Sequence, residues 1–296
     1  MAIVERKTMG ERTLHGVNIT LLILMTIVFF YPMWHCLMAS VSNPTALIGY
    51  RGFLFTPIGF SLEGYKAVLK NQNILTGYGN TLFYTLVGSS INVLLTIIGG
   101  YCLSRRSLMW KTPITLLVVF TMYVDFGLIP AFLNVRDLGL HNTRWAIILP
   151  EAINTYNLIV MRTAFGSISP SLEESAKLDG ANEITILFRI LLPLAKATIA
   201  VVALFYAVGH WNNWYSAMIY LQDRSKYPLQ LFLREILIAN SQTLGTQTNS
   251  RLDVVQHLDE LIKYCSIVVA TVPILIVYPF AQKYFVSGIM IGAVKG

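Results

Sequence analysis

Apolar runs long enough to cross a lipid bilayer recur along this chain of 296 residues. A helix needs about 20 apolar residues to span the hydrocarbon core, and only helices or closed barrels satisfy their backbone hydrogen bonds there. Charged residues make up only 12% of the chain, against about 25% in soluble domains. The runs lack the alternating pattern of about ten residues that barrel strands show. The sequence therefore predicts an all-α polytopic membrane protein.

Six membrane-spanning segments are predicted from these runs. They cover residues 17–40, 79–103, 113–134, 145–166, 194–221 and 265–287. An even number of spans places both termini on one side of the membrane. The loop over residues 104–112 holds Arg105, Arg106 and Lys111 without an acidic residue, and basic loops favour the cytoplasmic side. Both termini are therefore expected in the cytoplasm.

The same spans divide the chain into tails, a membrane domain and loops. The predicted parts are cytoplasmic tails at residues 1–16 and 288–296, a six-helix transmembrane domain at 17–287, outer loops at 41–78 and 222–263, and a cytoplasmic loop at 169–193. The first outer loop contains a short amphipathic run at residues 62–69. The second contains a predicted helix at residues 229–239, a polar segment at 240–250 that indicates flexibility, and a helix that resumes near Leu252.

Several classes of function are excluded by the remaining composition. The net charge of +7 is spread over the loops, where topology and contact with anionic lipid account for it, so no nucleic-acid partner is expected. The 3 cysteines and 5 histidines show no metal-binding or catalytic spacing, and neither a metal site nor a catalytic residue is predicted. No glycine is followed by lysine, which argues against a phosphate-binding loop. If ATP drives the protein, another subunit must hydrolyse it.

The cytoplasmic loop is polar and helical although it lies between two predicted spans. Pro170 suits the first position of a helix, and Ser171 with Glu174 forms a Ser-x-x-Glu capping box. Gly180 is expected to end this helix, and a second short helix follows until Pro193 breaks it. The second helix carries an apolar stripe of Ile184, Leu187, Phe188 and Leu191. An apolar stripe on an aqueous face usually binds a partner protein.

Polar residues inside the predicted spans are candidates for a translocation path, because ionisable groups are costly in lipid. Asp125 lies in the third span, and Glu151 lies in the fourth span beside Asn154. The alternative is that both acids sit near the membrane interface and pair with arginine or backbone groups.

The fifth span contains the densest cluster of aromatic and amide side chains. After His210, this cluster comprises Trp211, Asn212, Asn213, Trp214 and Tyr215. Aromatic faces and amides suit a sugar, which has apolar C–H faces and a rim of hydroxyls, so the cluster is a candidate lining of a carbohydrate path. The alternative is an aromatic belt at the outer interface, with amide hydrogen bonds between helices.

The cytoplasmic loop resembles the EAA loop of ABC importer permeases. Its motif residues are, in order, Glu174-Ser175-Ala176, Gly180, Ile190 and Leu192-Pro193, at the spacing of the family pattern. Ser175 replaces an alanine, and Ala197 stands where a proline is often found. The order of the spans, the tryptophan cluster of the fifth span and the closing sequence FVSGIMIGAVKG are similar to the carbohydrate-uptake group, in particular to maltose-type second permeases and their LplC/YtcP-like branch.

This resemblance implies a non-catalytic permease subunit of a bacterial type I ABC importer in the cytoplasmic membrane. Its partners would be a homologous second permease, two ABC ATPases that carry ATP and Mg, and an extracytoplasmic sugar-binding protein; the chain itself would bind no cofactor. The EAA helix would insert into the ATPase through Leu172, Glu173, Glu174, Ser175, Ala176, Leu178, Asp179, Gly180 and Ala181. Residues 294–296 would approach the ATPases, and the loop 222–263 would contact the binding protein. The branch suggests oligosaccharide substrates, including acidic ones from pectin or alginate.

Three other kinds of protein remain as alternatives. The first is an ABC permease for peptides or amino acids. It would not explain the aromatic and amide cluster of the fifth span, which suits a sugar, or the closing sequence that is similar to carbohydrate permeases. A secondary transporter driven by an ion gradient would predict inverted repeats, broken spans and membrane-embedded acid partners, and it gives no role to residues 169–193. A membrane-bound enzyme would need a polar catalytic group at a fixed depth.

Overall fold

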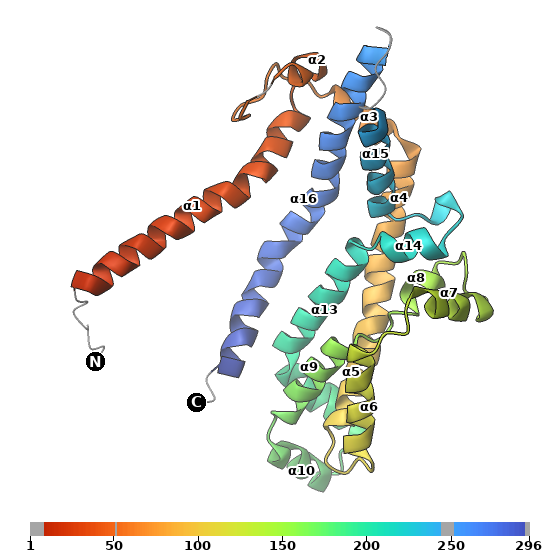
Figure 1. The fold of residues 1–296 in the computed structure, drawn as a ribbon. Coiled ribbons are helices and arrows are strands. Elements are labelled where there is room, and N and C mark those ends of the chain that lie inside the picture. Colours follow the sequence, from red (N-terminus) through yellow and green to blue (C-terminus); the bar gives the residue numbers. More distant parts are fainter. Residues whose placement is uncertain (1–8, 51, 244–251, 294–296) are drawn as a thin grey trace. The chain divides into compact units, whose positions relative to one another are not determined.

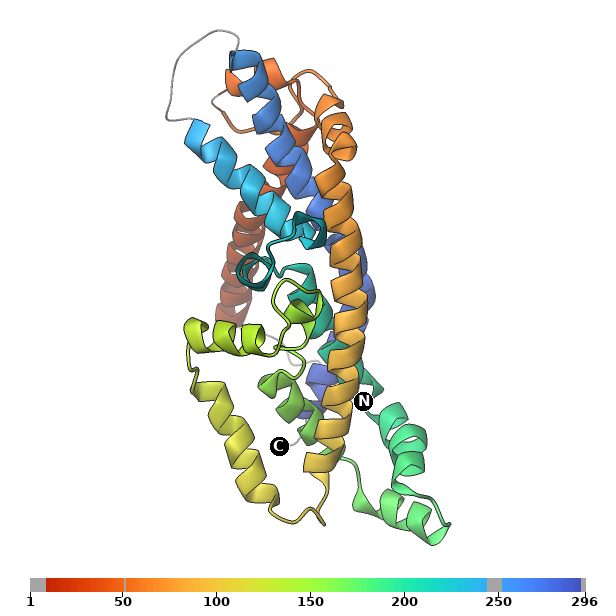
Figure 2. The same cartoon turned by 90° about the vertical axis from the view of Figure 1, so that its right-hand side faces the viewer.

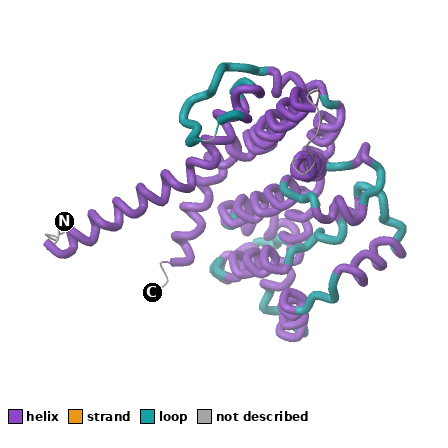
Figure 3. The backbone as a smooth tube through the Cα atoms, turned by 45° about the horizontal axis from the view of Figure 1, so that its top comes forward, coloured by secondary structure: helices purple, strands orange, loops and turns teal. Residues whose placement is uncertain are grey.

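The computed structural model describes residues 9–50, 52–243 and 252–293, which form helices joined by loops (Figure 3). The α-helices are α1 (Met9–Ser40), α2 (Pro44–Ile48), α3 (Glu63–Lys70), α4 (Gln72–Phe83), α5 (Ser89–Ser104), α6 (Lys111–Tyr123), α7 (Leu128–Asp137), α8 (Trp145–Ile148), α9 (Thr155–Gly166), α10 (Pro170–Leu178), α11 (Glu183–Thr185), α12 (Leu192–Leu194), α13 (Lys196–Trp211), α14 (Tyr215–Tyr220), α15 (Leu229–Thr243) and α16 (Leu252–Ala293). The π-helices η1 (Tyr84–Gly88) and η2 (Ile186–Leu191) and the 3-10 helix η3 (Arg224–Lys226) complete the described elements. The predicted all-α class is confirmed.

The described chain forms two compact units. One contains residues 1–70 and 236–269, and the other contains residues 71–235 and 270–296. Helix α1 begins within the predicted N-terminal tail, and α16 continues through most of the predicted C-terminal tail. The rest of both tails, including the predicted ATPase contact at 294–296, lies outside the described residues, as do residues 244–250 of the segment predicted to be flexible.

In the first unit, the loop after α1 folds back on the end of this helix. The Tyr31 hydroxyl accepts a hydrogen bond from the backbone N–H of Leu54 (3.0 Å), and the Trp34 indole N–H donates to the carbonyl of Phe55 (3.0 Å). An isolated antiparallel bridge joins Ser42 to Phe60. These contacts give the irregular loop a defined course.

Helix α3 confirms the amphipathic run predicted in this outer loop. Its Tyr65 hydroxyl forms a hydrogen bond with the Ser40 hydroxyl at the end of α1 (2.7 Å). The thiol of Cys265, a buried residue of α16, donates to the carbonyl of Ser40 (3.2 Å). Ser40 therefore joins α1, α3 and α16 within the first unit. Helix α15 begins at Leu229 and α16 begins at Leu252, as predicted for the second outer loop.

The second unit is built along one long helical rod. Helices α4, η1 and α5 follow one another without a break from Gln72 to Ser104 (Figure 2). Helix α5 packs against α9 and α13. A Cβ atom at Gly100 would lie 2.8 Å from Cγ of Met161 and 3.1 Å from the backbone nitrogen of Arg162. Glycine at this position therefore permits the close approach of α9 to α5.

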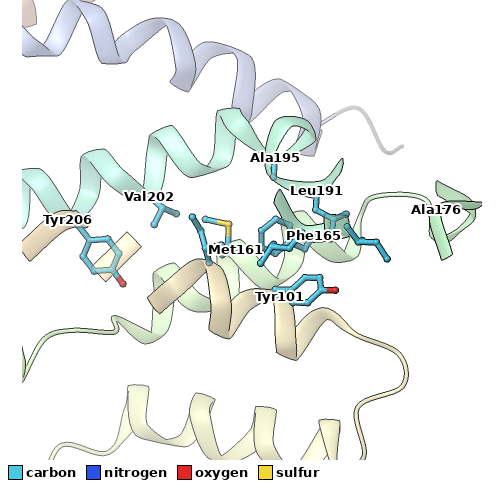
Figure 4. Packing of buried hydrophobic residues seen from close by; sticks show 11 residues of the cluster. Tyr101, Met161, Phe165, Ala176, Leu191, Ala195, Val202 and Tyr206 are labelled. Atoms are coloured by element: carbon cyan, nitrogen blue, oxygen red, sulfur yellow. The ribbon is translucent and has the colours of Figure 1, made fainter. Parts of the chain in front are cut away.

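The main apolar core of the second unit lies where α5, α9, η2 and α13 meet. Figure 4 shows Tyr101 of α5, Phe165 of α9 and Leu191 of η2 directed toward one another, with Val202 of α13 farther along the same cluster. Ala176 of α10 belongs to this cluster and is buried. The loop at residues 169–193 is therefore packed onto helices α5, α9 and α13 of its own chain.

Three described helices are long and apolar enough to cross a membrane, namely Met9–Ser40, Gln72–Ser104 and Glu260–Pro279. They contain or overlap the predicted first, second and sixth spans. Two bent pairs would raise the number to five: Lys111–Tyr123 with Leu128–Asp137, bent by 114°, and Glu183–Leu194 with Lys196–Trp211, bent by 84°. The first bent pair covers the predicted third span, and the change of direction between α6 and α7 is visible in Figure 1.

The predicted third, fourth and fifth spans are interrupted rather than continuous. Gly127 adopts a φ of 87° between α6 and α7. Asn154 accepts a hydrogen bond from the N–H of Asn157 (3.1 Å) and so starts α9 separately from α8. Asn213 accepts from the N–H of Ser216 (3.2 Å) near the start of α14. The breaks coincide with polar residues that were predicted to lie within continuous spans, namely Asp125, Glu151, Asn154, Asn212 and Asn213.

Candidate functional site

Residues 169–193, called the coupling loop below, start their first helix at the predicted position. Helix α10 begins at Pro170, and Ser169 is its N-cap residue. The Ser169 hydroxyl forms a hydrogen bond with the Ser171 hydroxyl (2.8 Å). The predicted capping box of Ser171 and Glu174 is wrong, because Ser171 already lies inside the helix.

Helix α10 ends in a Schellman motif at the predicted glycine. Gly180 has a φ of 81°, the N–H of Ala181 donates to the carbonyl of Ala176 (2.9 Å), and the N–H of Gly180 donates to that of Lys177 (3.0 Å). A Cβ atom at Gly180 would meet nothing within 4 Å. The backbone conformation, not a lack of space, therefore requires glycine here.

The large apolar side chains of the coupling loop form an exposed set and a buried set. The exposed set, called the docking patch below, consists of Leu172, Leu178, Ile184 and Phe188. The buried set consists of Ile186, Leu187 and Leu191. The prediction of one stripe through Ile184, Leu187, Phe188 and Leu191 is therefore wrong. The π-helix η2 changes the residue spacing and turns Leu187 and Leu191 into the core, which leaves a smaller apolar patch on the surface.

Two of the predicted coupling residues contact this chain itself. Glu173 forms an ion pair with Arg105, and the two side chains are only 17% and 14% exposed. Ala176 is buried in the same core cluster as Ile186 and Leu187. Close packing of α10 on η2 accounts for the small side chain at this position. Glu173 and Ala176 therefore contact other parts of this chain, and their contact with a partner stays a prediction.

The other predicted coupling residues remain accessible or half-buried. They are Leu172, Glu174, Ser175, Leu178, Asp179, Gly180 and the half-buried Ala181. Leu178 is 90% exposed. Together with the docking patch, Glu174 and Asp179 give the coupling loop an accessible surface that is both apolar and acidic.

The two acidic residues predicted within spans lie between helices. Asp125 follows α6, and its carboxylate accepts a hydrogen bond from the N–H of Gly127 (2.9 Å). Glu151 lies between α8 and α9, and its carboxylate accepts from the hydroxyl of Ser216 (3.1 Å). The alternative of backbone pairing is therefore observed for Asp125, whereas Glu151 borders a cavity.

This cavity has a volume of about 690 Å³ and lies among α5, α6, α9 and α13 of the second unit. Its polar lining includes Asn92, Glu151, Asn154, Asn157, Tyr206 and His210. The Asn92 amide N–H groups donate to the Glu151 carbonyl (3.1 Å) and to Nε2 of His210 (3.2 Å). Because Nε2 accepts, the proton of neutral His210 is assigned to Nδ1. Amide, imidazole and phenol groups of this kind suit a ligand that carries hydroxyls.

Three residues of the predicted fifth-span cluster do not line the cavity, namely Trp211, Asn212 and Asn213. Trp211 is buried, and its indole N–H donates to the carbonyl of Ala270 (3.2 Å). The Asn212 amide donates back to the carbonyl of Val208 within α13 (3.0 Å). Asn213 is engaged with the start of α14. These contacts are those of packing and helix termination.

The last two residues of that cluster lie at the surface of the second unit. Trp214 and Tyr215 contact each other edge to face, with ring centroids 5.6 Å apart. The Arg234 guanidinium lies 4.8 Å from the centroid of the Trp214 ring. The two rings are accessible to a ligand or a partner, and their assignment to a sugar path stays a prediction.

Sequence reasoning missed Asn92, Asn157 and Tyr206 as cavity residues. Asn92 did carry a signal, because it is an amide inside the apolar run of the second span, where polar side chains are costly. Its hydrogen-bond partner His210 is 118 positions away, which no local pattern reveals. Within the part of the chain that the structure describes, no group of three metal-ligating side chains gathers.

Comparisons with known proteins were made at the level of sequence and of structure. The chain is 40% identical over 275 residues to the polygalacturonan/rhamnogalacturonan transport system permease protein YtcP of Bacillus subtilis (strain 168), which covers 93% of this chain and 96% of that protein. It is 42% identical over 251 residues to the protein LplC of the same organism, which covers 85% of this chain and 84% of that protein.

A solved structure is also similar. It is the crystal structure of a bacterial ABC transporter involved in the import of the acidic polysaccharide alginate, and one of its chains superposes with a TM-score of 0.87 and 33% identity over 95% of this chain and 100% of that chain. A family model described as "Binding-protein-dependent transport system inner membrane component" matches residues 82–291. This match includes α5, the coupling loop and the cavity. The chain therefore belongs to the family of binding-protein-dependent transport system inner membrane components.

Proposed function

We propose that this chain is the permease subunit of an ATP-driven bacterial oligosaccharide importer, and that it forms half of the translocation path. The observation that carries this proposal is the docking patch, which extends from α10 over α11 and η2, beside the exposed Glu174 and Asp179. Apolar surface beside carboxylates suits a protein cleft that contains basic groups. Since the sequence contains no phosphate-binding loop, an ATP-driven importer needs a separate ATPase subunit, and we assign this surface to that subunit.

The complete transporter would contain four further subunits. They are a homologous second permease, two ABC ATPases that bind ATP and Mg, and an extracytoplasmic sugar-binding protein. The family description supports dependence on a binding protein. The coupling loop and both termini would face the cytoplasm, and the outer loop at 222–263 would contact the binding protein. This chain would catalyse no reaction and hold no cofactor.

Acidic oligosaccharides are the substrates that the relatives support best. YtcP is named for polygalacturonan and rhamnogalacturonan, and the superposed transporter imports alginate. The cavity beside α5 would contribute to the path, with Asn154, Asn92 and His210 as hydrogen-bonding groups for sugar hydroxyls. Glu151 lies at the same wall as an acidic group of the path.

The docking role is tested by a single charge placed on the docking patch. Leu178→Glu puts a carboxylate into the proposed apolar contact, so the ATPase subunits should no longer copurify with the tagged permease. Phe60→Glu is the matched control, because Phe60 is also exposed but lies in the predicted outer loop. Full retention of the ATPases by the Leu178→Glu complex would contradict the proposal.

A further inference from the structure

Polar side chains fasten the coupling loop to the end of α5. Arg105 directly follows this helix and pairs with Glu173 of α10. The same guanidinium donates to the Ser104 hydroxyl from Nε (3.2 Å) and from Nη2 (3.0 Å), and it lies 4.4 Å from the centroid of the Tyr101 ring. Two side chains of α5 and one carboxylate of α10 therefore fix the position of one arginine.

Tyr101 provides a second attachment. Its hydroxyl donates to the carboxylate of Glu183 in α11, and that carboxylate also pairs with Lys177 of α10 (2.7 Å). The Tyr101 ring and Ala176 belong to one apolar cluster. Helices α10 and α11 are thus attached to the same end of α5 by polar and apolar contacts together.

Burial distinguishes the Arg105–Glu173 pair from an ordinary surface ion pair. Its side chains are 14% and 17% exposed, whereas those of the Lys177–Glu183 pair are 50% and 55% exposed. Solvent screens an exposed pair, but removal of one partner from a shielded pair leaves a charge without compensation. The shielded pair therefore opposes movement of α10 independently of α5.

Helix α5 connects this attachment to the cavity. It is helical from Ser89 to Ser104 and carries Asn92, whose amide bonds to His210 of α13 in the cavity wall. A displacement of α10 can therefore reach the cavity through one rigid helix, which is the physical continuity that coupling between distant sites requires.

We propose that Arg105 and Glu173 form a clamp that transmits movement of the coupling loop to α5. Glu173 is then a positioning residue, and its exposed neighbour Glu174 keeps the docking role. This inference rests on the proposed function, because an ATPase must move the loop. Tyr101, Glu183 and Lys177 support the clamp through their own contacts between α5, α11 and α10.

The clamp is tested in the complete complex in proteoliposomes, with Glu173→Gln and Arg105→Gln. We measure retention of the ATPases, the rate of ATP hydrolysis and uptake of labelled oligogalacturonate. Each variant should retain the ATPases and hydrolyse ATP, but transport per ATP should fall at least about fivefold, the lower end of coupling factors between sites. Arg106→Gln is the matched control, because Arg106 is the exposed neighbour of Arg105 and should leave transport per ATP unchanged.

The reversed pair, Arg105→Glu with Glu173→Arg, tests the contact itself and should recover part of the lost coupling. Failure to recover any coupling would overturn the clamp. Release of the ATPases by Glu173→Gln would also overturn the clamp, because Glu173 would then be a docking residue. A proportional loss of ATP hydrolysis and uptake would overturn it as well, because such a loss indicates general destabilisation. If the wild-type complex neither binds ATPases nor imports the probe, the proposed function fails instead.

Discussion

Gly180 shows how one residue can fix the geometry of a docking element. Its positive φ ends α10, while the space around its α-carbon is open. Asparagine tolerates this conformation, whereas a β-branched residue is strained there by about 1–2 kcal/mol. Gly180→Asn should therefore retain the ATPases on copurification, and Gly180→Val should retain fewer. Equal retention by both variants would show that the turn does not determine docking.

Adjacent glutamates show what a motif can and cannot predict about single residues. Pro170 and Gly180 predicted the start and the end of α10, because these signals are local. The motif did not show that Glu173 is paired within the chain whereas Glu174 is exposed. This difference depends on Arg105, which lies 68 positions before Glu173. In the same way, Asn92 and His210 are paired by the packing of α5 on α13, which the sequence alone does not specify.

At the scale of helices, the contact between α5 and α9 depends on the absence of a side chain at Gly100. Gly100→Ala would place a Cβ atom within 3 Å of Met161, and overpacking of this kind costs about 1–3 kcal/mol. Gly79→Ala in α4 is the matched control, because a Cβ atom there meets nothing within 4 Å. Thermal unfolding of the purified complex should show a lower midpoint for Gly100→Ala only. A similar midpoint for both variants would contradict this packing.

Helix starts and helix breaks differ in how well the sequence reveals them. The starts of α15 and α16 were predicted, and the amphipathic run predicted at residues 62–69 lies within one residue of α3. The break between α6 and α7 at Gly127 was missed, because the neighbouring Asp125 was interpreted as a polar residue within a continuous span. The π-helix η2 was missed because its apolar residues also fit an ordinary helical period, so the division into buried and exposed residues was partly wrong.

For the whole molecule, the broken helices bear on the choice between classes of transporter. Interrupted spans were expected of a transporter driven by an ion gradient, and the second unit contains them. They do not favour that class here, because the chain belongs to a family of binding-protein-dependent systems and its coupling loop presents a docking patch. The breaks at Asn154 and near His210 instead border the cavity.

The most direct test is uptake of labelled oligogalacturonate into proteoliposomes that contain this permease, its partner permease, the ATPases and the binding protein. An ATP-driven importer predicts that uptake requires ATP on the side of the ATPases and is abolished by Leu178→Glu. The account would be contradicted if uptake continued without ATP, followed an imposed ion gradient and were unaffected by Leu178→Glu. The coupling loop would then not transmit the energy of ATP hydrolysis to transport.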